Sequence, residues 1–313
     1  MPKNNAQDTL YATESVLREL RGALLGYAEI EAEILLEEAM RRDQSWEGRR
    51  SDFLGLGSHP QPRVTAGSRV IALDWARARL AGTPLQHLTG WQVFLDHRYR
   101  VSPEVLIPRP ETEGLVLLVQ EWIGKTFSHT PIHGLEFGLG SGVISIELLS
   151  GYPMLKMDAS EVSQKAVQVA RSNAELILGV NRAQEALQIV ENLSDLGLDH
   201  QADFLVSNPP YLDPEQTGSE VTREVFEHEP HLALFGPVGD PSFFYRKLAY
   251  DGRKWLKRGG CGFFEIPHER ASEVEKMFME NGWTQVQLHS DLTGRRRYLQ
   301  AMCATSKTEQ EEK

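Results

Sequence analysis

The sequence predicts an α/β fold, with a doubly wound, mostly parallel, seven-stranded sheet behind a small all-helical N-terminal domain and a β-hairpin linker. Three observations predict it. From Ile132 onward, short apolar runs alternate with segments of helical period, which is typical of a parallel sheet covered on both faces. A glycine-rich stretch follows the first apolar run, and two consecutive prolines end the fourth. The residues before Ile132 have a mainly helical period instead.

Composition bounds the class of protein. The 313 residues, 41% of them hydrophobic, suffice for one large or two modest domains with a real core. No apolar run approaches the roughly 20 residues that span a bilayer, and the polar start has no signal-peptide pattern, so we expect a cytoplasmic protein without a membrane partner. The two cysteines, Cys261 and Cys303, lie in apolar segments, which predicts buried thiols and no metal site.

The charge disfavours one class of partner. The formal net charge is −11, with 44 acidic and 33 basic residues, and such a chain repels a phosphate backbone unless its basic residues cluster. The main clusters, Arg49-Arg50 and residues 295–297, are small and are typical of solvated surface. We therefore expect no direct binding of long nucleic acid.

The N-terminal part, residues 1–84, is predicted to be all-helical. Residues 9–42 have the pattern of two helices, residues 43–65 form a loop-rich connection with several glycines and prolines, and residues 70–80 supply a third helix. Small domains of this size often recognise a partner. Residues 85–108 are predicted to be a linker, in which residues 91–94 and 98–101 form a hairpin.

Residues 109–305 are predicted to form the α/β domain, followed by a disordered tail at residues 306–313. Helical patterns cover residues 115–122 and 143–149, the segment around Ala166 and the segment around Val274. The predicted strands are residues 132–137, 154–158, 187–190, 204–206, 261–266, 284–288 and 298–303.

A glycine-rich loop, Glu-Phe-Gly-Leu-Gly-Ser-Gly at residues 136–142, lies between the first strand and the first helix of this domain. Its Gly-x-Gly-x-Gly spacing differs from that of pyrophosphate-binding loops, so it does not specifically indicate a dinucleotide. Asp158 is predicted to end the second strand, about 20 residues on, where a carboxylate accepts hydrogen bonds from a ribose diol. The pair favours a nucleoside cofactor without pyrophosphate; the alternative is a tight turn followed by a helix-capping Asp158.

A rigid corner, Ser-Asn-Pro-Pro-Tyr at residues 207–211, follows the fourth strand. Neither proline has an N–H to donate, so the strand must stop at Asn208. Open α/β sheets bind ligands at the carboxyl ends of parallel strands, where this turn would hold Asn208 and Tyr211 toward a ligand. The alternative is an ordinary strand-ending turn. Glu111 or Thr112, near a predicted helix start after a proline, fits ordinary helix capping. The alternative for this segment is that Arg109, bracketed by two prolines, is a stiff arginine near a charged ligand.

The order of glycine loop, strand-end acid and Asn-Pro-Pro-Tyr corner resembles that of S-adenosylmethionine-dependent methyltransferases that act on planar amide or amino nitrogens. Several further motifs occur in order along the chain: Leu85-x-x-Leu88-Thr89-Gly90, Ile107-Pro108-Arg109-Pro110-Glu111-Thr112-Glu113, Glu229-Pro230 with Ala233-Leu234, Gly259-Gly260 with Glu265-Ile266, and Asp291-Leu292-x-Gly294. Together with the corner, they are similar to those of the release factor glutamine methyltransferase family (HemK/PrmC), and the resemblance covers nearly the whole chain.

The resemblance implies a class I, Rossmann-like methyltransferase that moves a methyl group from S-adenosylmethionine to the glutamine amide of the Gly-Gly-Gln motif of class 1 peptide chain release factors. It implies that the helical domain helps to hold the release factor. The implied catalytic residues are Asn208, Pro209 and Tyr211; the cofactor residues are Gly138, Leu139, Gly140, Ser141, Gly142, Asp158, Asn192, Leu193 and Asn208; and the substrate residues are Asn208, Pro209, Pro210, Tyr211, Arg109 and Glu111.

Five positions differ from the family pattern: Glu136 replaces Asp, Pro267 replaces Gly, Arg270 replaces Gln, and Asn192-Leu193 replace an acidic residue and an aromatic or other apolar one. We therefore expect a weaker or different adenine contact. Two alternative functions share the fold: an adenine amino-group methyltransferase on DNA or RNA, which requires a basic face, and a catalytically silent binding protein.

Overall fold

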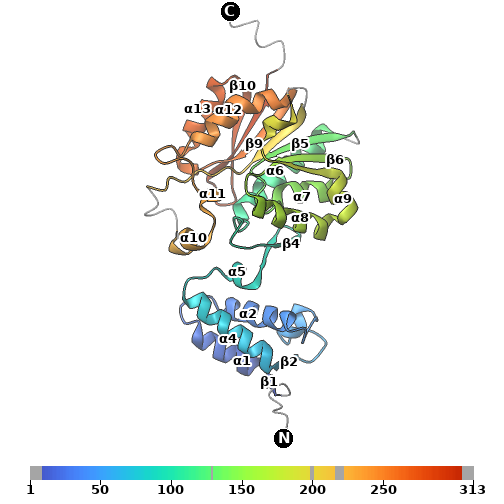
Figure 1. The fold of residues 1–313 in the computed structure, drawn as a ribbon, viewed down its shortest axis with the longest axis vertical. Coiled ribbons are helices and arrows are strands. Elements are labelled where there is room, and N and C mark those ends of the chain that lie inside the picture. The colour runs from blue at the N-terminus through green and yellow to red at the C-terminus, as the bar shows by residue number, and fades with distance from the viewer. Residues whose placement is uncertain (1–8, 128–129, 198–200, 216–221, 305–313) are drawn as a thin grey trace, which may run out of the picture. The chain divides into compact units, whose positions relative to one another are not determined.

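The computed structural model describes residues 9–127, 130–197, 201–215 and 222–304 (Figure 1). The chain divides into two compact units: one runs to Gly90 and includes Arg223–His228, and the other comprises Trp91–Thr222 and the residues from Glu229 onward. The predicted tail at residues 306–313 lies outside the described residues.

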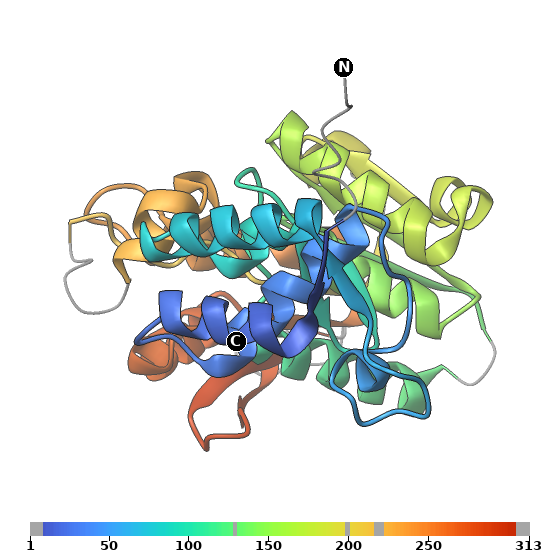
Figure 2. The ribbon, with the colours of Figure 1, turned by 90° about the horizontal axis from the view of Figure 1, so that it is seen from below.

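The N-terminal unit is built around helices, which Figures 1 and 2 show packed side by side. One apolar cluster, which includes Leu20, Leu36 and Phe53, fills the space between them. The expectation of an all-helical unit misses one feature, a short antiparallel pair of three-residue strands that are too brief to show a period of two. The helices are α1 (Thr13–Ala23), α2 (Glu29–Arg42), α3 (Arg50–Phe53), α4 (Ala66–Leu80) and α5 (Leu85–Thr89), and the strands are β1 (Leu10–Ala12) and β2 (Arg63–Thr65).

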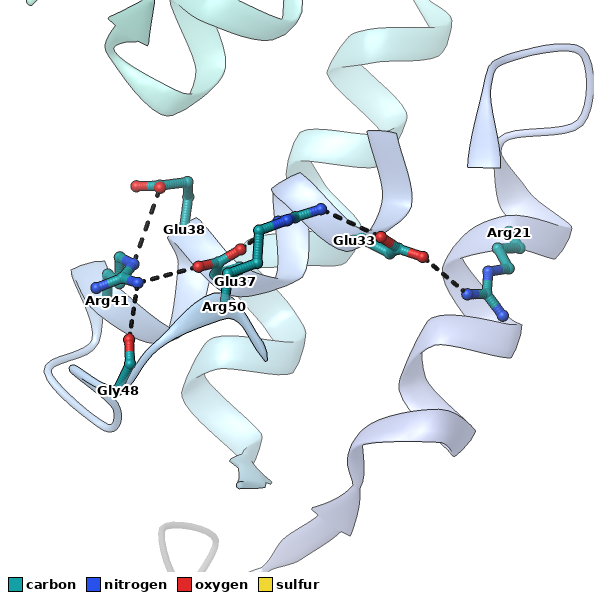
Figure 3. A network of polar contacts seen from close by, with 7 residues as sticks. All are labelled: Arg21, Glu33, Glu37, Glu38, Arg41, Gly48 and Arg50. Atoms are coloured by element: carbon teal, nitrogen blue, oxygen red, sulfur yellow. Dashed lines mark hydrogen bonds and ion pairs between the residues drawn. The ribbon is translucent and has the colours of Figure 1, made fainter. Parts of the chain in front are cut away.

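A network of ion pairs joins three helices of this unit (Figure 3). Glu33 of α2 accepts hydrogen bonds from Arg21 of α1 at 3.2 Å and from Arg50 of α3 at 3.1 Å. Glu37, one turn further along α2, binds Arg50 as well and accepts from Arg41 at 3.0 Å. Partly exposed pairs contribute about 1 kcal/mol or less each. Because each pair contributes little to stability, we infer that the network mainly holds α1 and α3 in position on α2.

A distant segment, α10 (Arg223–His228), belongs to the N-terminal unit. Arg79 of α4 is buried, and its Nη1 donates to a carboxylate oxygen of Glu224 at 3.0 Å, while its Nε donates to Glu31 at 2.7 Å. A buried guanidinium needs such partners because an unpaired buried charge is costly.

The larger unit contains the predicted mixed sheet, and the structure confirms this fold class. Four neighbouring pairs are parallel and the two pairs at one edge are antiparallel, in the order β10-β11-β9-β8-β5-β6-β7. The strands are β5 (Ile132–Phe137), β6 (Leu155–Ser160), β7 (Leu187–Val190), β8 (Ala202–Ser207), β9 (Leu256–Glu265), β10 (Trp283–Ser290) and β11 (Arg296–Cys303).

Helices cover both faces of this sheet. Successive side chains of β8 alternate between them: Phe204 and Val206 join the apolar cluster under α6 and α7, whereas Leu205 joins the cluster under α12 and α13. Cys261 and Cys303 are buried free thiols, as predicted. The helical elements are α6 (Pro110–Thr126), α7 (Val143–Gly151), α8 (Gln164–Leu178), α9 (Val180–Ala186), α11 (His231–Leu234), α12 (Phe243–Trp255) and α13 (Ala271–Glu280), with short 3-10 turns η2 (Leu193–Leu196) and η3 (His268–Arg270).

The predicted hairpin is present as β3 (Trp91–Phe94) and β4 (His97–Arg100) and belongs to the larger unit. The hydroxyl of the buried Tyr99 donates to Glu147 of α7 at 2.9 Å. Asn173 of α8 binds both the backbone N–H and the carbonyl of Arg100, at 2.7 and 3.0 Å. Within the described residues, no helix is both long enough and apolar enough to cross a bilayer.

Candidate active site

The direction of winding reverses between β5 and β8, so the carboxyl ends of these two strands are neighbours at a topological switch point. The glycine loop leaves β5 there and the Asn-Pro-Pro-Tyr corner leaves β8. The hydroxyl of Ser207 donates to the carbonyl of Phe137 at 2.7 Å and joins the two strand ends directly. The structure therefore brings together the two motifs that the sequence singles out.

The glycine loop has a backbone that only glycine adopts without strain. Gly138, Gly140 and Gly142 have φ of +80°, +55° and +86°. A Cβ at Gly142 would lie 2.8 Å from Cδ1 of Ile146 and 3.3 Å from Cβ of Ala170, so this glycine leaves room for α8 beside the start of α7. At Gly138 and Gly140 the same position faces open space. These two glycines leave the loop's backbone accessible to a ligand.

The loop's amides are largely used within the protein. The N–H groups of Gly138 and Leu139 both donate to the carbonyl of Ser160, at 3.1 and 2.9 Å, and Gly140 donates to the carboxylate of Glu161 at 2.9 Å. A pyrophosphate site needs such N–H groups aimed at the anion. The loop thus suits a ligand that packs along the backbone better than a dinucleotide.

Glu136, one of the departures from the family pattern, anchors the start of α7. One of its carboxylate oxygens accepts from the backbone N–H of Ser145 at 3.1 Å and from the Ser145 hydroxyl. The side chain is 1% exposed, and this burial raises its pKa to about 8 against the favourable bonds from Ser145. Glu136 at the start of the loop is therefore bonded to the first turn of α7 at its end.

The prediction that Asp158 ends the second strand is wrong. β6 continues to Ser160, because Ala159 and Ser160 still pair with β7. The buried carboxylate of Asp158 lies beside Nε2 of His133, at 2.8 Å. Glu161 is the acid at the strand end, and it contacts the glycine loop through Gly140.

A local signal points to Glu161. Ser163 caps α8 through the N–H of Ala166, which marks the helix start and places the strand end just before Glu161. The second carboxylate oxygen of Glu161 accepts from the N–H of Ser163 at 2.8 Å. At the end of β7, Asn192 caps η2 in a reciprocal pair with Asp195, and Leu193 is buried.

The corner after β8 is held by side chains from distant segments. The amide Nδ2 of Asn208 donates to the hydroxyl of Thr112, at 3.2 Å, in the first turn of α6. That hydroxyl donates to the carboxylate of Glu265, at 2.8 Å, at the end of β9. Thr112 and Glu265 are buried, Asn208 is half-buried, and the sequence reasoning assigned no site role to the first two.

The backbone after the prolines is also fixed. Arg270 donates to the carbonyl of Tyr211 at 2.5 Å and to the hydroxyl of Ser242 at 3.0 Å. Leu212 forms a parallel bridge with Phe235. Burial raises the pKa of Tyr211, so its ring stays a neutral phenol. Arg270, a departure from the family pattern, therefore supports the corner.

The guanidinium of Arg109 is engaged inside the unit. It forms an ion pair with the buried Glu229 at 2.5 Å, and Glu229 also accepts from the N–H of Ile107 at 3.0 Å. Glu111 is exposed, and its carbonyl accepts from the hydroxyl of Tyr298 at 2.6 Å. These bonds fix the segment that positions Thr112. Contact of Arg109 and Glu111 with a substrate stays a prediction.

Comparison with known proteins gives concordant findings. A family model described as "Methyltransferase small domain" matches residues 117–234. The release factor glutamine methyltransferase of Koribacter versatilis is 32% identical over 283 residues, which are 90% of this chain and 94% of that protein. The protein of the same name from Bacteroides thetaiotaomicron is 37% identical over 220 residues, which are 70% of this chain and 75% of that protein.

Among solved structures, the hMettl16 catalytic domain in complex with a MAT2A 3'UTR hairpin has a TM-score of 0.50 and 17% identity, and the match covers 76% of this chain and 82% of that one. At this identity the match bears on the fold alone.

Proposed function

The chain belongs to the release factor glutamine methyltransferase family, and from this premise we propose that it transfers a methyl group from S-adenosylmethionine to the glutamine side-chain amide in the Gly-Gly-Gln motif of class 1 peptide chain release factors. The observation that carries the proposal is the junction of the glycine loop with the Asn208 corner at adjacent strand ends. A cofactor site beside an amide-binding corner suits transfer between the two.

The loop is the proposed cofactor site. Residues 138–142 would hold S-adenosylmethionine along their backbone, where Gly138 and Gly140 offer open space. When bound, this cofactor supplies a methyl group on a positively charged sulfur. We assign the ribose to Glu161 in place of Asp158, because Glu161 lies at the strand end beside Gly140. Asn192 and Leu193 remain the proposed adenine contacts at the end of β7.

The corner is the proposed acceptor site. A glutamine amide nitrogen is a poor nucleophile, so orientation is the main catalytic resource. The side-chain oxygen of Asn208 and the carbonyl of Pro209 would accept the two amide hydrogens and stabilise positive charge as the new N–CH₃ bond forms. Tyr211 would pack against the flat amide, and Pro210 stiffens the turn.

The partner is proposed to be the release factor, held in part by the N-terminal unit, and the setting to be the cytoplasm. The apolar side chains of that unit form its own core, so partner contacts would come from its surface.

The test is incubation of the purified chain with labelled S-adenosylmethionine and one of three acceptors: a release factor, its Gln-to-Ala motif variant, or duplex DNA. We expect label on the first acceptor only. Label on DNA but none on the release factor would contradict the proposal and favour an adenine methyltransferase. Failure to bind cofactor at millimolar concentration would favour a silent binding protein.

A further inference from the structure

The side chain of Asn208 has two ends of similar shape and opposite hydrogen-bonding character. Its oxygen accepts, whereas its NH₂ group donates. The proposed reaction needs the oxygen toward the glutamine, because the glutamine NH₂ presents hydrogens. An asparagine turned by half a rotation would oppose donor to donor. Something in the protein must therefore select one orientation.

The bonds behind Asn208 have a direction. An ionised carboxylate only accepts, so the single hydroxyl hydrogen of Thr112 is committed to Glu265, at 2.8 Å. The Thr112 oxygen then has only lone pairs to offer, and it receives the NH₂ group of Asn208 at 3.2 Å. The oxygen of Asn208 is left on the other side of the amide.

We propose that Thr112 and Glu265 are positioning residues that fix the amide orientation of Asn208, so that its oxygen is presented to the acceptor glutamine. This proposal rests on the proposed function, since it concerns the same corner. It adds two residues, from the start of α6 and the end of β9, that would not touch the substrate themselves.

The protonation state of Glu265 sets the direction. A protonated Glu265 becomes a donor, and it would release the Thr112 hydrogen toward the Asn208 oxygen, which favours the reversed amide. Burial raises the pKa of Glu265 to about 7, against the bond from Thr112. The groups that face Glu265 are Thr112, Arg109 and Glu111 near the start of α6, Tyr211 after β8, Tyr245 of α12, and Arg297 and Tyr298 of β11.

A simpler role for these two residues is to stabilise the fold. Thr112 connects α6 to β9, and losing the bond would leave a buried carboxylate poorly satisfied. A purely structural role predicts a lower melting temperature, with no specific change in the pH dependence of turnover. The orientation role predicts a changed pH profile as well.

The experiment compares Thr112→Val, which keeps the shape and removes the hydroxyl, with Thr112→Ser, which keeps the hydroxyl. We expect Thr112→Val to lower kcat/KM about tenfold, the value of one lost hydrogen bond, and Thr112→Ser to restore it to within about threefold. Cofactor affinity, measured by calorimetry, should change less than about threefold in both variants, because neither loses a loop contact.

The second readout is the pH profile of turnover from about pH 5.5 to 8.5. The wild type should lose activity below about pH 7, as Glu265 takes up a proton and the hydrogen bonds reverse. Thr112→Val should lack this decline, because without the Thr112 hydroxyl no chain of hydrogen bonds joins Glu265 to Asn208. Glu265→Gln should lack it as well, and this variant serves if Thr112→Val does not fold.

A Thr112→Val or Glu265→Gln enzyme with the wild-type kcat/KM and pH profile would overturn the proposal. So would a loss that Thr112→Ser does not restore. Failure of the proposed function looks different: the wild type itself would then place no methyl group on the release factor. The wild-type control alone therefore distinguishes failure of the orientation proposal from failure of the proposed function. If the wild type places no methyl group on the release factor, both proposals fail.

Discussion

The glycine loop and the Asn-Pro-Pro-Tyr corner lie at neighbouring strand ends, yet they are held in different ways. The loop is fixed from within its own strand-helix-strand segment: Glu136 is anchored by Ser145, nine residues away, and Gly140 donates to Glu161, 21 residues away. The corner is fixed by distant segments: Asn208 binds Thr112, 96 residues away, and Thr112 binds Glu265, 153 residues away. Each region contains a buried glutamate with a raised pKa.

The difference matches the different roles proposed for the two regions, cofactor binding by the loop and acceptor orientation by the corner. In the loop the side chains are absent or turned inward, so a ligand meets backbone and open space. At the corner a side-chain amide and a proline carbonyl are the proposed contacts of the acceptor, and side chains on the far side of Asn208 must set the orientation of its amide. Changes in the loop should therefore alter cofactor binding, and changes at the corner should alter turnover.

The largest expected effect separates the two regions directly. Asn208→Ala removes the oxygen that we propose orients the acceptor, so we expect turnover to fall by about 10²–10³-fold, as for the loss of one preorganised transition-state contact. Calorimetry should find S-adenosylmethionine affinity within several-fold of the wild type. Near-normal turnover would remove the corner from the mechanism.

The converse change is Gly138→Val in the loop. A β-branched side chain at φ +80° both strains the backbone and occupies the open space that a cofactor would use, so cofactor affinity should fall at least about tenfold. Gly179→Val is the matched control, because Gly179 has φ +78° and open space but lies between α8 and α9. Equal loss of affinity in both variants would mean that strain alone explains the effect.

A smaller effect distinguishes two acids. Glu161→Ala should weaken cofactor binding about tenfold, because it removes a charged acceptor at the end of β6. Asp158→Asn should change affinity less than about threefold, although its contact with His133 makes some loss of stability expected. Titration calorimetry on both variants decides between them. The reverse ranking would return the ribose contact to Asp158.

The last prediction concerns Glu136 and the pH dependence of the free energy of unfolding, with little effect expected on activity. Its pKa in the folded protein, about 8, exceeds its ordinary value of 4.5, so the folded state binds the proton more tightly than the unfolded state. The free energy of unfolding therefore falls as pH rises from about 4.5 to about 8. Glu136→Gln should flatten this dependence, by an amount on the order of 4 kcal/mol between the two ends.

Urea denaturation of the wild type and Glu136→Gln at about pH 5 and pH 8.5 measures this difference. Glu265 contributes in the same direction up to about pH 7, so some dependence should remain in the variant. Identical slopes in the two proteins would show that Glu136 does not titrate in this range.

Much of the fold is predictable because the signals are local. The bounds of β5 and β7 agree with the sequence pattern, and the prolines after Asn208 end β8 as expected. The helices α3, α5, α9, α10, α11 and α12 are missing from the prediction. For α10 a physical reason is clear: it has six residues, too few to show a helical period, and its contact with the N-terminal unit includes a pair between Arg79 and Glu224, far apart in sequence.

In the site, too, the local motifs are predictable from the sequence, and the contacts between distant segments are not. The glycine loop and the corner are visible as short motifs, and the structure places them at adjacent strand ends. The apolar pattern ends β6 at Asp158, because its last two residues are set by pairing with β7; the Ser163 cap of α8 is the local sign that places the strand end before Glu161. Thr112 and Glu265 could not be connected to Asn208 from the sequence, because three segments must fold before their side chains meet.

The most direct test of the central claim is tandem mass spectrometry of a release factor after incubation with S-adenosylmethionine and either the wild type or Asn208→Ala. We expect one added methyl group on the side-chain amide of the Gly-Gly-Gln glutamine with the wild type, and an unmodified peptide with the variant. A methyl group on any other residue, or on the same glutamine at equal yield with Asn208→Ala, would contradict it.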